Sequence, residues 1–263
     1  MAAPAVPPTV LSFAATDPTA GAGLLADALT LAALGCHPLG VVTAVTVQDT
    51  AGIEAILPVE AEWLRRQSQR VLADIPVQAF KIGFVGSAAN VEAIADMVGA
   101  YASVPVVLDP VLASGRGDPM ATSEMLTAMR RHLLPRTTLL TPNSLEARRL
   151  AGTDDLAECA RRLLDLGCAN VLVTGTHEAG EKVVNTLHGR EGVLRRDAWE
   201  RLPGEYHGSG CTLASACAAF LARGLPLGDA VYQAQAYTWR ALAAGFRPGR
   251  AQSLPGRFFS AGT

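Results

Sequence analysis

The stretch His207-Gly-Ser-Gly-Cys-Thr-Leu213 places two glycines directly before a long run of small and apolar residues. Glycine favours a tight turn, and the run over residues 209–223 predicts a buried helix. The first N–H groups of a helix have no partner within it, and the helix dipole adds positive charge at that end. A glycine-rich turn that opens a helix therefore predicts an anion-binding loop, made of Gly208, Ser209 and Gly210.

Cys211 stands in the first turn of this predicted helix, where we expect the helix dipole to lower the pKa of its thiol. The chain has five cysteines, an odd number without a Cys-x-x-Cys pair, which argues against a disulfide framework and a structural zinc site. The other four are expected to be buried as small hydrophobic residues: Cys36, Cys159, Cys168 and Cys217.

Upstream of the loop, short β-branched runs alternate with helical stretches, which predicts parallel strands joined by crossover helices. Strands are expected at residues 9–15, 39–47, 53–59, 79–83, 104–108, 137–140 and 170–173, and helices at 21–34, 61–72, 90–101, 122–133, 144–151, 156–166, 209–223 and 229–244. Because Leu39–Val47 is apolar on both faces, we expect a central strand there. Residues 175–207 depart from this alternation of strands and helices. A hairpin around His188-Gly189 predicts a flap outside the core there.

Length and composition predict one α/β domain at residues 9–263, after a disordered tail at residues 1–8. The net charge of −2 gives no reason to expect a nucleic-acid partner or a membrane surface. Hydrophobic residues make up 49% of the chain, yet no apolar run approaches the length that spans a bilayer. The first residues lack a basic region typical of a secretory signal, so we expect a cytoplasmic protein.

A second glycine motif, Gly21-Ala-Gly23-Leu-Leu-Ala26, lies between the first expected strand and helix. It matches the dinucleotide pattern G-x-G-x-x-A, with Asp49 near the distance expected of an acidic partner. One such fingerprint is a weak signal, because glycines also let a tight strand-to-helix turn pack closely. A nicotinamide-dependent enzyme therefore stays an alternative at this point.

Acidic and amide residues follow two of the expected strands. Asp109 ends one apolar strand, and Asn143 and Glu146 follow the next, three residues apart and so on one helix face. Asp109 and Glu146 could hold Mg²⁺, which prefers one or two carboxylates together with waters and phosphate oxygens. Asn143 is equally compatible with a helix N-cap, with Glu146 as its capping-box partner. Neither lysine lies in a Walker A context, so a kinase here would not be a P-loop enzyme.

Taken in order, these motifs resemble the hydroxymethylpyrimidine/phosphomethylpyrimidine kinases of thiamine biosynthesis, over about residues 9–245. The motifs are Asp17-Pro-Thr-Ala-Gly-Ala-Gly-Leu-Leu-Ala-Asp27, Thr43-Ala-Val-Thr-Val-Gln48-Asp-Thr50, Lys81-Ile-Gly83, Val107-Leu-Asp109-Pro-Val111 with Ser114-Gly-Arg-Gly-Asp118-Pro, Thr141-Pro-Asn143-Ser-Leu-Glu146-Ala and His207-Gly-Ser-Gly-Cys211-Thr-Leu. No single motif is decisive, but this set in this order is specific.

The resemblance implies a three-layer αβα ribokinase-like fold with a mostly parallel central sheet and a small flap, usually in a homodimer. It implies that ATP and Mg²⁺ phosphorylate 4-amino-5-hydroxymethyl-2-methylpyrimidine and then its monophosphate. The glycine-rich loop would be the anion hole, and Cys211 would take the place of the catalytic aspartate of sugar kinases. Pyrimidine contacts would be Ala22, Asp27, Gln48, Phe84, Val111 and Cys211, and ATP contacts would be Asn143, Thr174, Thr176, Gly208 and Gly210.

This chain departs from the family pattern at two positions. Phe84 replaces a methionine that many members have, and Thr174-Gly-Thr-His177 replaces a segment in which many members have a phosphate-contacting lysine. Lys182 or a nearby arginine is a candidate replacement for that lysine. Two alternatives stay open: a pyridoxine or pyridoxal kinase of the same fold, and a non-catalytic pyrimidine or nucleotide sensor.

Overall fold

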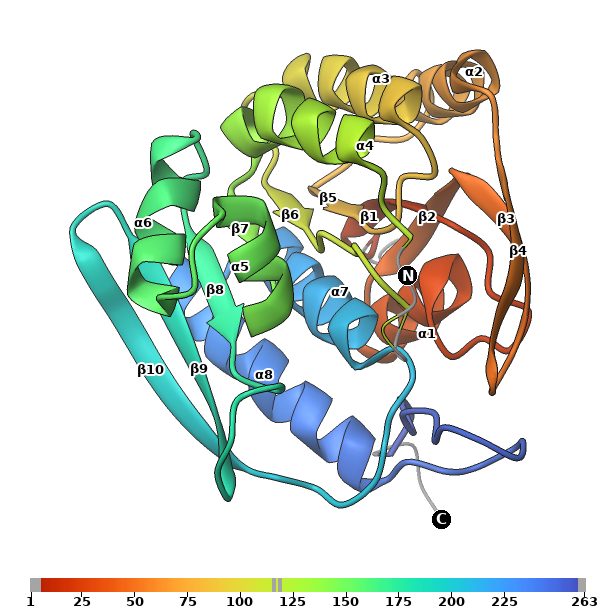
Figure 1. Cartoon of the computed structure of the whole chain (residues 1–263). Coiled ribbons are helices and arrows are strands. Elements are labelled where there is room, and N and C mark those ends of the chain that lie inside the picture. Colours follow the sequence, from red (N-terminus) through yellow and green to blue (C-terminus); the bar gives the residue numbers. More distant parts are fainter. Residues whose placement is uncertain (1–5, 115–116, 118–119, 260–263) are drawn as a thin grey trace, which may run out of the picture.

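The computed structural model describes residues 6–114, 117 and 120–259 as one sheet between two layers of helices (Figure 1). The sheet has eight strands in the order β10-β9-β8-β7-β6-β5-β1-β2. Neighbouring strands run parallel from β2 to β8, whereas β9 and β10 are antiparallel to their neighbours. The strands are β1 (Thr9–Ala14), β2 (His37–Val42), β5 (Ala79–Ile82), β6 (Val106–Leu108), β7 (Leu139–Leu140), β8 (Val171–Thr174), β9 (Lys182–Gly189) and β10 (Gly192–Glu200).

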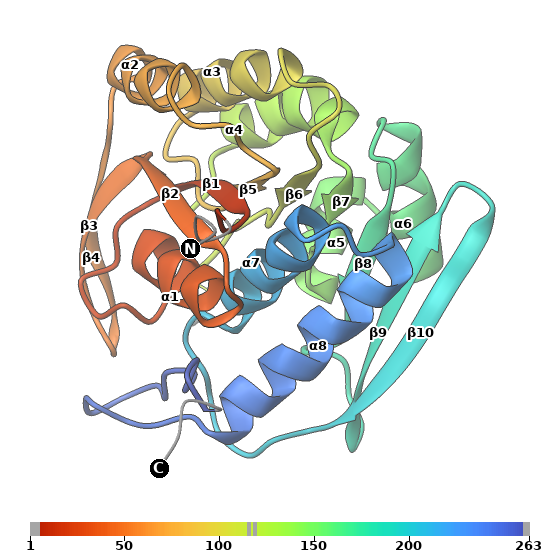
Figure 2. The same ribbon diagram turned by 180° about the vertical axis from the view of Figure 1, so that it is seen from behind.

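Helices cover both faces of the sheet, and the view from behind shows α7 and α8 crossing one of them (Figure 2). The helices on that side are α1 (Gly23–Ala33), α7 (Ser209–Ala222) and α8 (Leu227–Ala243). The opposite side carries α2 (Ala61–Leu72), α3 (Ala88–Gly99), α4 (Ser123–Ala128), the short turns η1 (Met129–Leu133) and η2 (Leu134–Arg136), α5 (Ser144–Ala151) and α6 (Leu156–Asp165). This arrangement confirms the three-layer αβα prediction.

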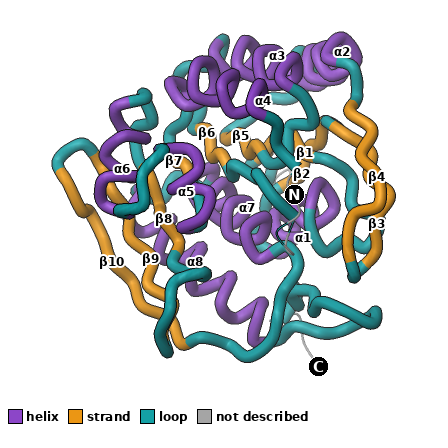
Figure 3. The backbone as a smooth tube through the Cα atoms, viewed as in Figure 1, coloured by secondary structure: helices purple, strands orange, loops and turns teal. Residues whose placement is uncertain are grey.

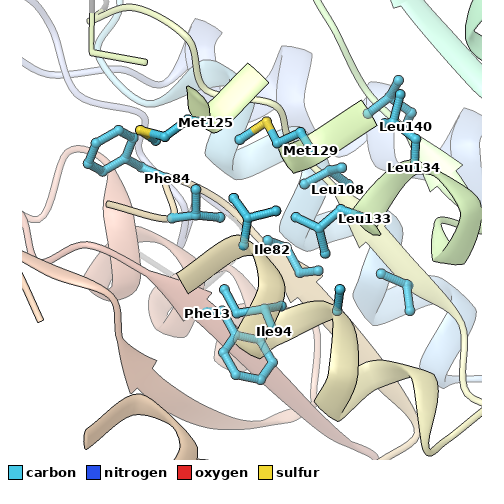
Figure 4. Packing of buried hydrophobic residues seen from close by; sticks show 14 of the residues in the cluster. Phe13, Ile82, Phe84, Ile94, Leu108, Met125, Met129, Leu133, Leu134 and Leu140 are labelled. Carbon is cyan, nitrogen blue, oxygen red and sulfur yellow. The ribbon is translucent and has the colours of Figure 1, made fainter. Parts of the chain in front are cut away.

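Two buried hydrophobic clusters explain the layers, because side chains of a strand point alternately to the two faces of a sheet. In β1, Leu11 and Phe13 belong to the cluster beneath α2–α6, whereas Val10 belongs to the cluster beneath α7 and α8. Figure 4 shows the first cluster, where Phe13, Ile82 and Leu108 from neighbouring strands lie close to the helical residues Ile94 and Met129.

The prediction of a central strand at Leu39–Val47 is wrong. The chain leaves the sheet at the buried Thr43, whose hydroxyl donates a hydrogen bond to Phe84 O and whose N–H donates to Ala14 O. The first part is the edge strand β2, and the second is β3 (Ala44–Asp49), which pairs with β4 (Gly52–Pro58) in a separate two-stranded sheet. Figure 3 shows this pair apart from the main sheet.

The prediction of a flap at residues 175–207 is also wrong for its two strands. β9 pairs with β8 in register from Val171↔His188 to Thr174↔Asn185, so the hairpin extends the main sheet. The turn lies between Gly189 and Gly192, not at His188-Gly189. The small sheet that is separate from the main one is formed by β3 and β4 instead.

The expected disordered tail falls largely on residues 1–5, which lie outside the described residues. Its last residue, Pro8, accepts a hydrogen bond from the N–H of His37 (2.8 Å) and is thereby attached to β2. Among the described residues, no helix is long and apolar enough to cross a membrane.

Candidate active site

The predicted site residues gather at the carboxyl edge of the sheet, where open α/β sheets bind ligands. Asp109 directly follows β6, Phe84 follows β5, and Thr174 is the last residue of β8. Asn143 lies beside Thr174 in an isolated parallel bridge. The parallel strands therefore bring together residues that are far apart in the chain.

The anion loop has the predicted form, because Gly208 precedes α7 in a left-handed conformation with φ of 85°. A Cβ atom at Gly208 would lie 1.8 Å from Gly21 O, so a side chain at this position is excluded by both backbone strain and close contact. A Cβ atom at Gly210 would instead lie 3.6 Å from Asp109 Oδ2. The start of α7 thus rests between the β1–α1 turn and the Asp109 carboxylate.

Asp109 is buried with only 4% of its surface exposed, and its Oδ2 atom has no hydrogen-bond partner among the described residues. Burial raises the pKa of this carboxyl to about 6, and the negative charge of Asp27 adds to the effect. The charge of Lys81 and a hydrogen bond from Cys211 offset part of the rise. A buried carboxylate oxygen without a partner is suited to a cation or a proton.

Glu146 and Asn143 form the capping box that the sequence offered as one interpretation. Asn143 Oδ1 accepts from Glu146 N (2.9 Å), and Glu146 Oε2 accepts from Asn143 N (3.0 Å). Burial and then the nearby Asp109 raise the pKa of Glu146 to about 8. The carboxyls of Asp109 and Glu146 thus both have raised pKa values, and each makes ionisation of the other less favourable. A divalent cation bound near the unpaired oxygen of Asp109 would relieve this repulsion.

Asp27 lies beneath the site in an ion pair that the sequence prediction missed. Lys81 Nζ lies 2.8 Å from Asp27 Oδ1, both side chains are fully buried, and Ser215 Oγ donates to the same carboxylate (2.8 Å). The carboxylate of Asp27, a predicted pyrimidine contact, has no exposed surface and is already paired with Lys81. A lone lysine in an apolar strand was the only sign of the pair in the sequence.

The expected lowering of the Cys211 pKa is wrong. Burial raises the pKa of this thiol to about 12; the charge of Lys81 lowers the pKa, and the charges of Asp109 and Asp27 raise it further. At neutral pH the thiol is therefore protonated. The other four cysteines are buried, as expected, and all five are free thiols.

Near the predicted pyrimidine contact Gln48, a series of hydrogen bonds joins Gln48, His207 and Asp17. His207 Nε2 lies 2.7 Å from Asp17 Oδ2 and 3.3 Å from Gln48 Nε2. Asp17 Oδ2 also accepts from Ala22 N (2.7 Å), so Ala22 and Gln48 are held through the same carboxylate. Asp17 is therefore a structural partner of His207. Together these hydrogen bonds hold Ala22 and Gln48, two predicted pyrimidine contacts, near the anion loop.

Two more predicted pyrimidine contacts, Phe84 and Val111, lie at the hydrophobic cluster beneath α2–α6. Phe84 is nearly buried with 6% of its surface exposed, and Val111 is partly buried against the cluster of Figure 4. The segment Ser114–Pro119 falls partly outside the described residues.

The glycine motif at residues 21–26 is a tight turn and not a dinucleotide site. A Cβ atom at Gly23 would lie 2.3 Å from Ala15 O, which explains the glycine by close backbone approach. Asp49 is occupied in the β3–β4 turn, where its Oδ1 accepts from Ala51 N (2.7 Å) and its Oδ2 from Arg250 (3.2 Å).

Thr174, a predicted ATP contact, stands where many family members have a lysine. Thr174 is buried, and its N–H donates to Pro142 O (2.9 Å). Arg201 donates to the carbonyls of Thr176 (2.7 Å), Glu178 (2.7 Å) and Gly180 (2.9 Å), so it holds the loop after β8. Lys182, the first candidate replacement, is exposed at the start of β9.

Comparison with known proteins agrees with this geometry. The phosphomethylpyrimidine kinase family model matches residues 17–255. The hydroxymethylpyrimidine/phosphomethylpyrimidine kinase of Streptomyces coelicolor is 39% identical over 252 residues, covering 92% of this chain and 91% of its own. That of Escherichia coli is 36% identical over 239 residues, covering 89% of this chain and 90% of its own.

Solved structures show the same fold. The phosphomethylpyrimidine kinase of Clostridium difficile has a TM-score of 0.78 at 31% identity, covering 89% of this chain and 99% of its own. An ADP complex of Bacillus subtilis pyridoxal kinase has a TM-score of 0.90 at 26% identity, covering 97% of this chain and 99% of its own. The likeness to curated kinases over most of both chains, with the anion loop, Cys211 and Asp109 in one place, shows that this chain belongs to the phosphomethylpyrimidine kinase family.

Proposed function

We propose that this enzyme uses MgATP to phosphorylate the hydroxymethyl group of 4-amino-5-hydroxymethyl-2-methylpyrimidine and then the resulting monophosphate. The observation that supports this most directly is the anion loop at the start of α7, with Cys211 and Asp109 against it. Mass spectrometry of the products formed from the pyrimidine and MgATP tests the proposal. Absence of both the monophosphate and the diphosphate would overturn it.

The pyrimidine is proposed to bind between the β1–α1 turn and the β3–β4 pair, against Ala22, Gln48, Phe84 and Val111. An amide can pair with both a ring nitrogen and an exocyclic amine, because it carries a donor and an acceptor side by side. Gln48 is half-buried and close to His207, so its amide is already held near the proposed ring position.

Gln48→Ala is expected to weaken pyrimidine binding by about 1–3 kcal/mol, because polar ring atoms would lose their partner in a buried pocket. Binding of ATP should be unchanged, since the nucleotide is proposed to lie at the other end of the carboxyl edge. Isothermal titration calorimetry with each ligand measures both effects. Pyrimidine binding as strong as that of the parent would contradict the assignment of the pocket.

ATP is proposed to lie along the carboxyl edge near Asn143, Thr174 and Thr176, with its phosphates toward Gly208 and Gly210. The ADP complex of the Bacillus subtilis relative supports nucleotide use by this fold. The N–H groups at the start of α7 would stabilise the charge of the transferring phosphoryl group, and positioning would supply most of the remaining acceleration.

Mg²⁺ would be held by Glu146 and Asp109 and would neutralise charge on the phosphates. The fit rests on the unpaired Oδ2 atom of Asp109 and on the raised pKa values of both carboxyls. Glu146 would then serve both as a capping residue of α5 and as a metal-site residue.

Glu146→Gln is expected to raise the Mg²⁺ concentration needed for half-maximal activity, because a neutral amide replaces a carboxylate near the phosphates. Thermal stability should change little, since glutamine can also complete a capping box. Mg²⁺ titration of activity and melting temperatures of both proteins measure the two effects. A lowered melting temperature with unchanged Mg²⁺ dependence would restrict Glu146 to capping.

We propose that Cys211 passes the proton of the hydroxymethyl group onward. Because the buried thiol is protonated at neutral pH, it can accept that proton only as its own proton moves to a neighbour. Asp109 is the group to which Cys211 hydrogen-bonds. The alcohol oxygen then forms its bond to the γ-phosphorus as the bond from that phosphorus to ADP breaks.

Pyridoxal kinase is a fold neighbour at 26% identity, whereas curated pyrimidine kinases reach 40%, so the pyrimidine is the favoured substrate. A homodimer is proposed because the β3–β4 pair exposes Val45, Val47 and Leu57 on one face. Analytical ultracentrifugation tests this.

A cytoplasmic location, where ATP is abundant, is proposed as well and is tested by cell fractionation.

A further inference from the structure

The chain after α8 returns to the active site. Residues 244–259, here called the C-terminal segment, pair through an isolated bridge with the residues that lead into the anion loop: His207 N donates to Ser253 O (2.9 Å), and Ser253 N donates to Glu205 O (3.0 Å). Gly256 N donates to Ala241 O (2.8 Å), which attaches the segment to the end of α8. This segment therefore packs directly behind the loop.

Arg257 is the buried cation of this segment, with 5% of its surface exposed. Its guanidinium donates to Ala20 O (3.0 Å), to Gly21 O and to Thr212 Oγ1 (3.2 Å). Tyr237 OH donates to the backbone carbonyl of Arg257 (2.7 Å) and holds the residue in place. Among the described residues, no carboxylate lies within ion-pair distance of Arg257.

These contacts reach both sides of the anion loop. Gly21 O, which Arg257 contacts, is the atom against which Gly208 packs so closely that a Cβ atom would lie 1.8 Å away. Thr212 Oγ1, which also receives a hydrogen bond from Arg257, donates to Gly208 O (2.8 Å). A buried positive charge thus lies behind the N-terminus of α7, where its field adds to the helix dipole. Among the described residues, Asp27 and Asp17 act on this charge only from beyond ion-pair distance.

We infer that Arg257 is a positioning residue that holds the anion loop in its observed conformation and makes it favour substrates that already carry a phosphate. The inference rests on the proposed function. A buried cation is costly unless it is paired, and an anion on the other side of the loop supplies the missing charge. The transferring phosphoryl group of ATP is proposed to meet the loop in both transfers, but the monophosphate adds a further charge of about −1.5 to −2 beside it, whereas the hydroxymethyl compound is neutral. Arg257 lies beyond the residues that the family model matches, so it is a feature of this chain outside that model.

The test compares the two substrates in Arg257→Met, which removes the charge and keeps a side chain of similar length. We expect kcat/KM for the monophosphate to fall about ten-fold further than kcat/KM for the hydroxymethyl compound, because the lost Coulomb attraction acts on the added phosphate. Calorimetry without ATP should show the same selective loss in Kd for the monophosphate. Arg257→Lys, which retains the charge, should keep most of the preference.

Arg247→Met is the matched control, because it removes the same charge from an exposed position of the same segment and should leave both substrates unchanged. Arg257→Gln retains donors without the charge and replaces the methionine variant if that one does not fold. An equal loss of kcat/KM for both substrates would mean that Arg257 only stabilises the local structure, and it would overturn the inference. A parent enzyme that phosphorylates neither substrate would overturn the proposed function instead.

Discussion

Replacing Lys81 by methionine is expected to lower the free energy of unfolding by about 3–5 kcal/mol, because the buried Asp27 carboxylate loses its cation. Lys81 Nζ lies 2.8 Å from Asp27 Oδ1, and neither side chain has exposed surface. Burial opposes the charge of Lys81, but the charge of Asp27 and, to a smaller extent, that of Asp109 raise its pKa, so the ammonium group stays charged. Urea denaturation of both proteins measures the loss.

Lys182→Met is the control, because it removes the only other lysine from an exposed position and should leave stability nearly unchanged. The double variant Lys81→Met/Asp27→Leu should recover part of the lost stability, since it buries no charge. It should not recover activity, because the charge of Lys81 lowers the pKa of both Asp109 and Cys211. A Lys81→Met protein as stable as the parent would contradict the buried-pair argument.

The sequence predicts most of the fold because periodicity and end signals agree along much of the chain. The predicted helices at 61–72 and 144–151 match α2 and α5, and the predicted strand at 9–15 matches β1 to within one residue. Each has a clear apolar pattern bounded by turn-forming or capping residues. Elements with such local signals are predictable without tertiary information.

The two errors in strand placement have a common physical cause. At Thr43 the chain changes sheets through hydrogen bonds to Ala14 and Phe84, residues that are distant in sequence. Likewise, β9 joins the main sheet because its backbone pairs with β8. Hydropathy patterns describe which faces of a strand are apolar but not which strand it pairs with. Pairing partners therefore had to come from the structure.

The composition of the site was predictable, but its charge state was not. Asp109, Cys211 and the anion loop lie together as the motifs suggest. The pKa of Cys211 depends on how deeply the thiol is buried and on Asp109 and Asp27, whose positions are set by tertiary packing. Asp27 and Lys81 are 54 residues apart in the chain, so nothing local indicates their pairing. The role of Arg257 depends in the same way on contacts that span most of the sequence.

The Cys211→Ala variant is expected to affect the two phosphoryl transfers very differently. In the first transfer the nucleophile is an alcohol that must lose a proton, so removing the relay should slow this step by on the order of 10²–10⁴. In the second transfer the nucleophile is a phosphate monoester, whose second pKa is about 6 and which is largely ionised at neutral pH. That step needs placement and charge neutralisation, so we expect it to be slowed far less.

Initial rates from the hydroxymethyl compound and from its monophosphate, measured separately, give the two losses. Cys211→Ser, whose hydroxyl can also pass a proton onward, should stay closer to the parent in the first transfer than Cys211→Ala does. Gly210→Val is the contrasting variant, because a branched side chain against Asp109 in the anion loop should slow both transfers.

The pH dependence separates a relay from a thiolate that acts as a base in the resting enzyme. Because burial raises the pKa of Cys211 to about 12, the thiolate fraction is very small at neutral pH and rises about ten-fold for each pH unit below that value. A thiolate base would therefore make the first transfer gain about ten-fold per pH unit over the second between pH 7 and 9. A relay through the protonated thiol keeps the ratio of the two rates constant over this range, which is the result we expect.

Equal losses in both transfers for Cys211→Ala would instead mean that the thiol only shapes the pocket, and proton transfer would have to be assigned to another group.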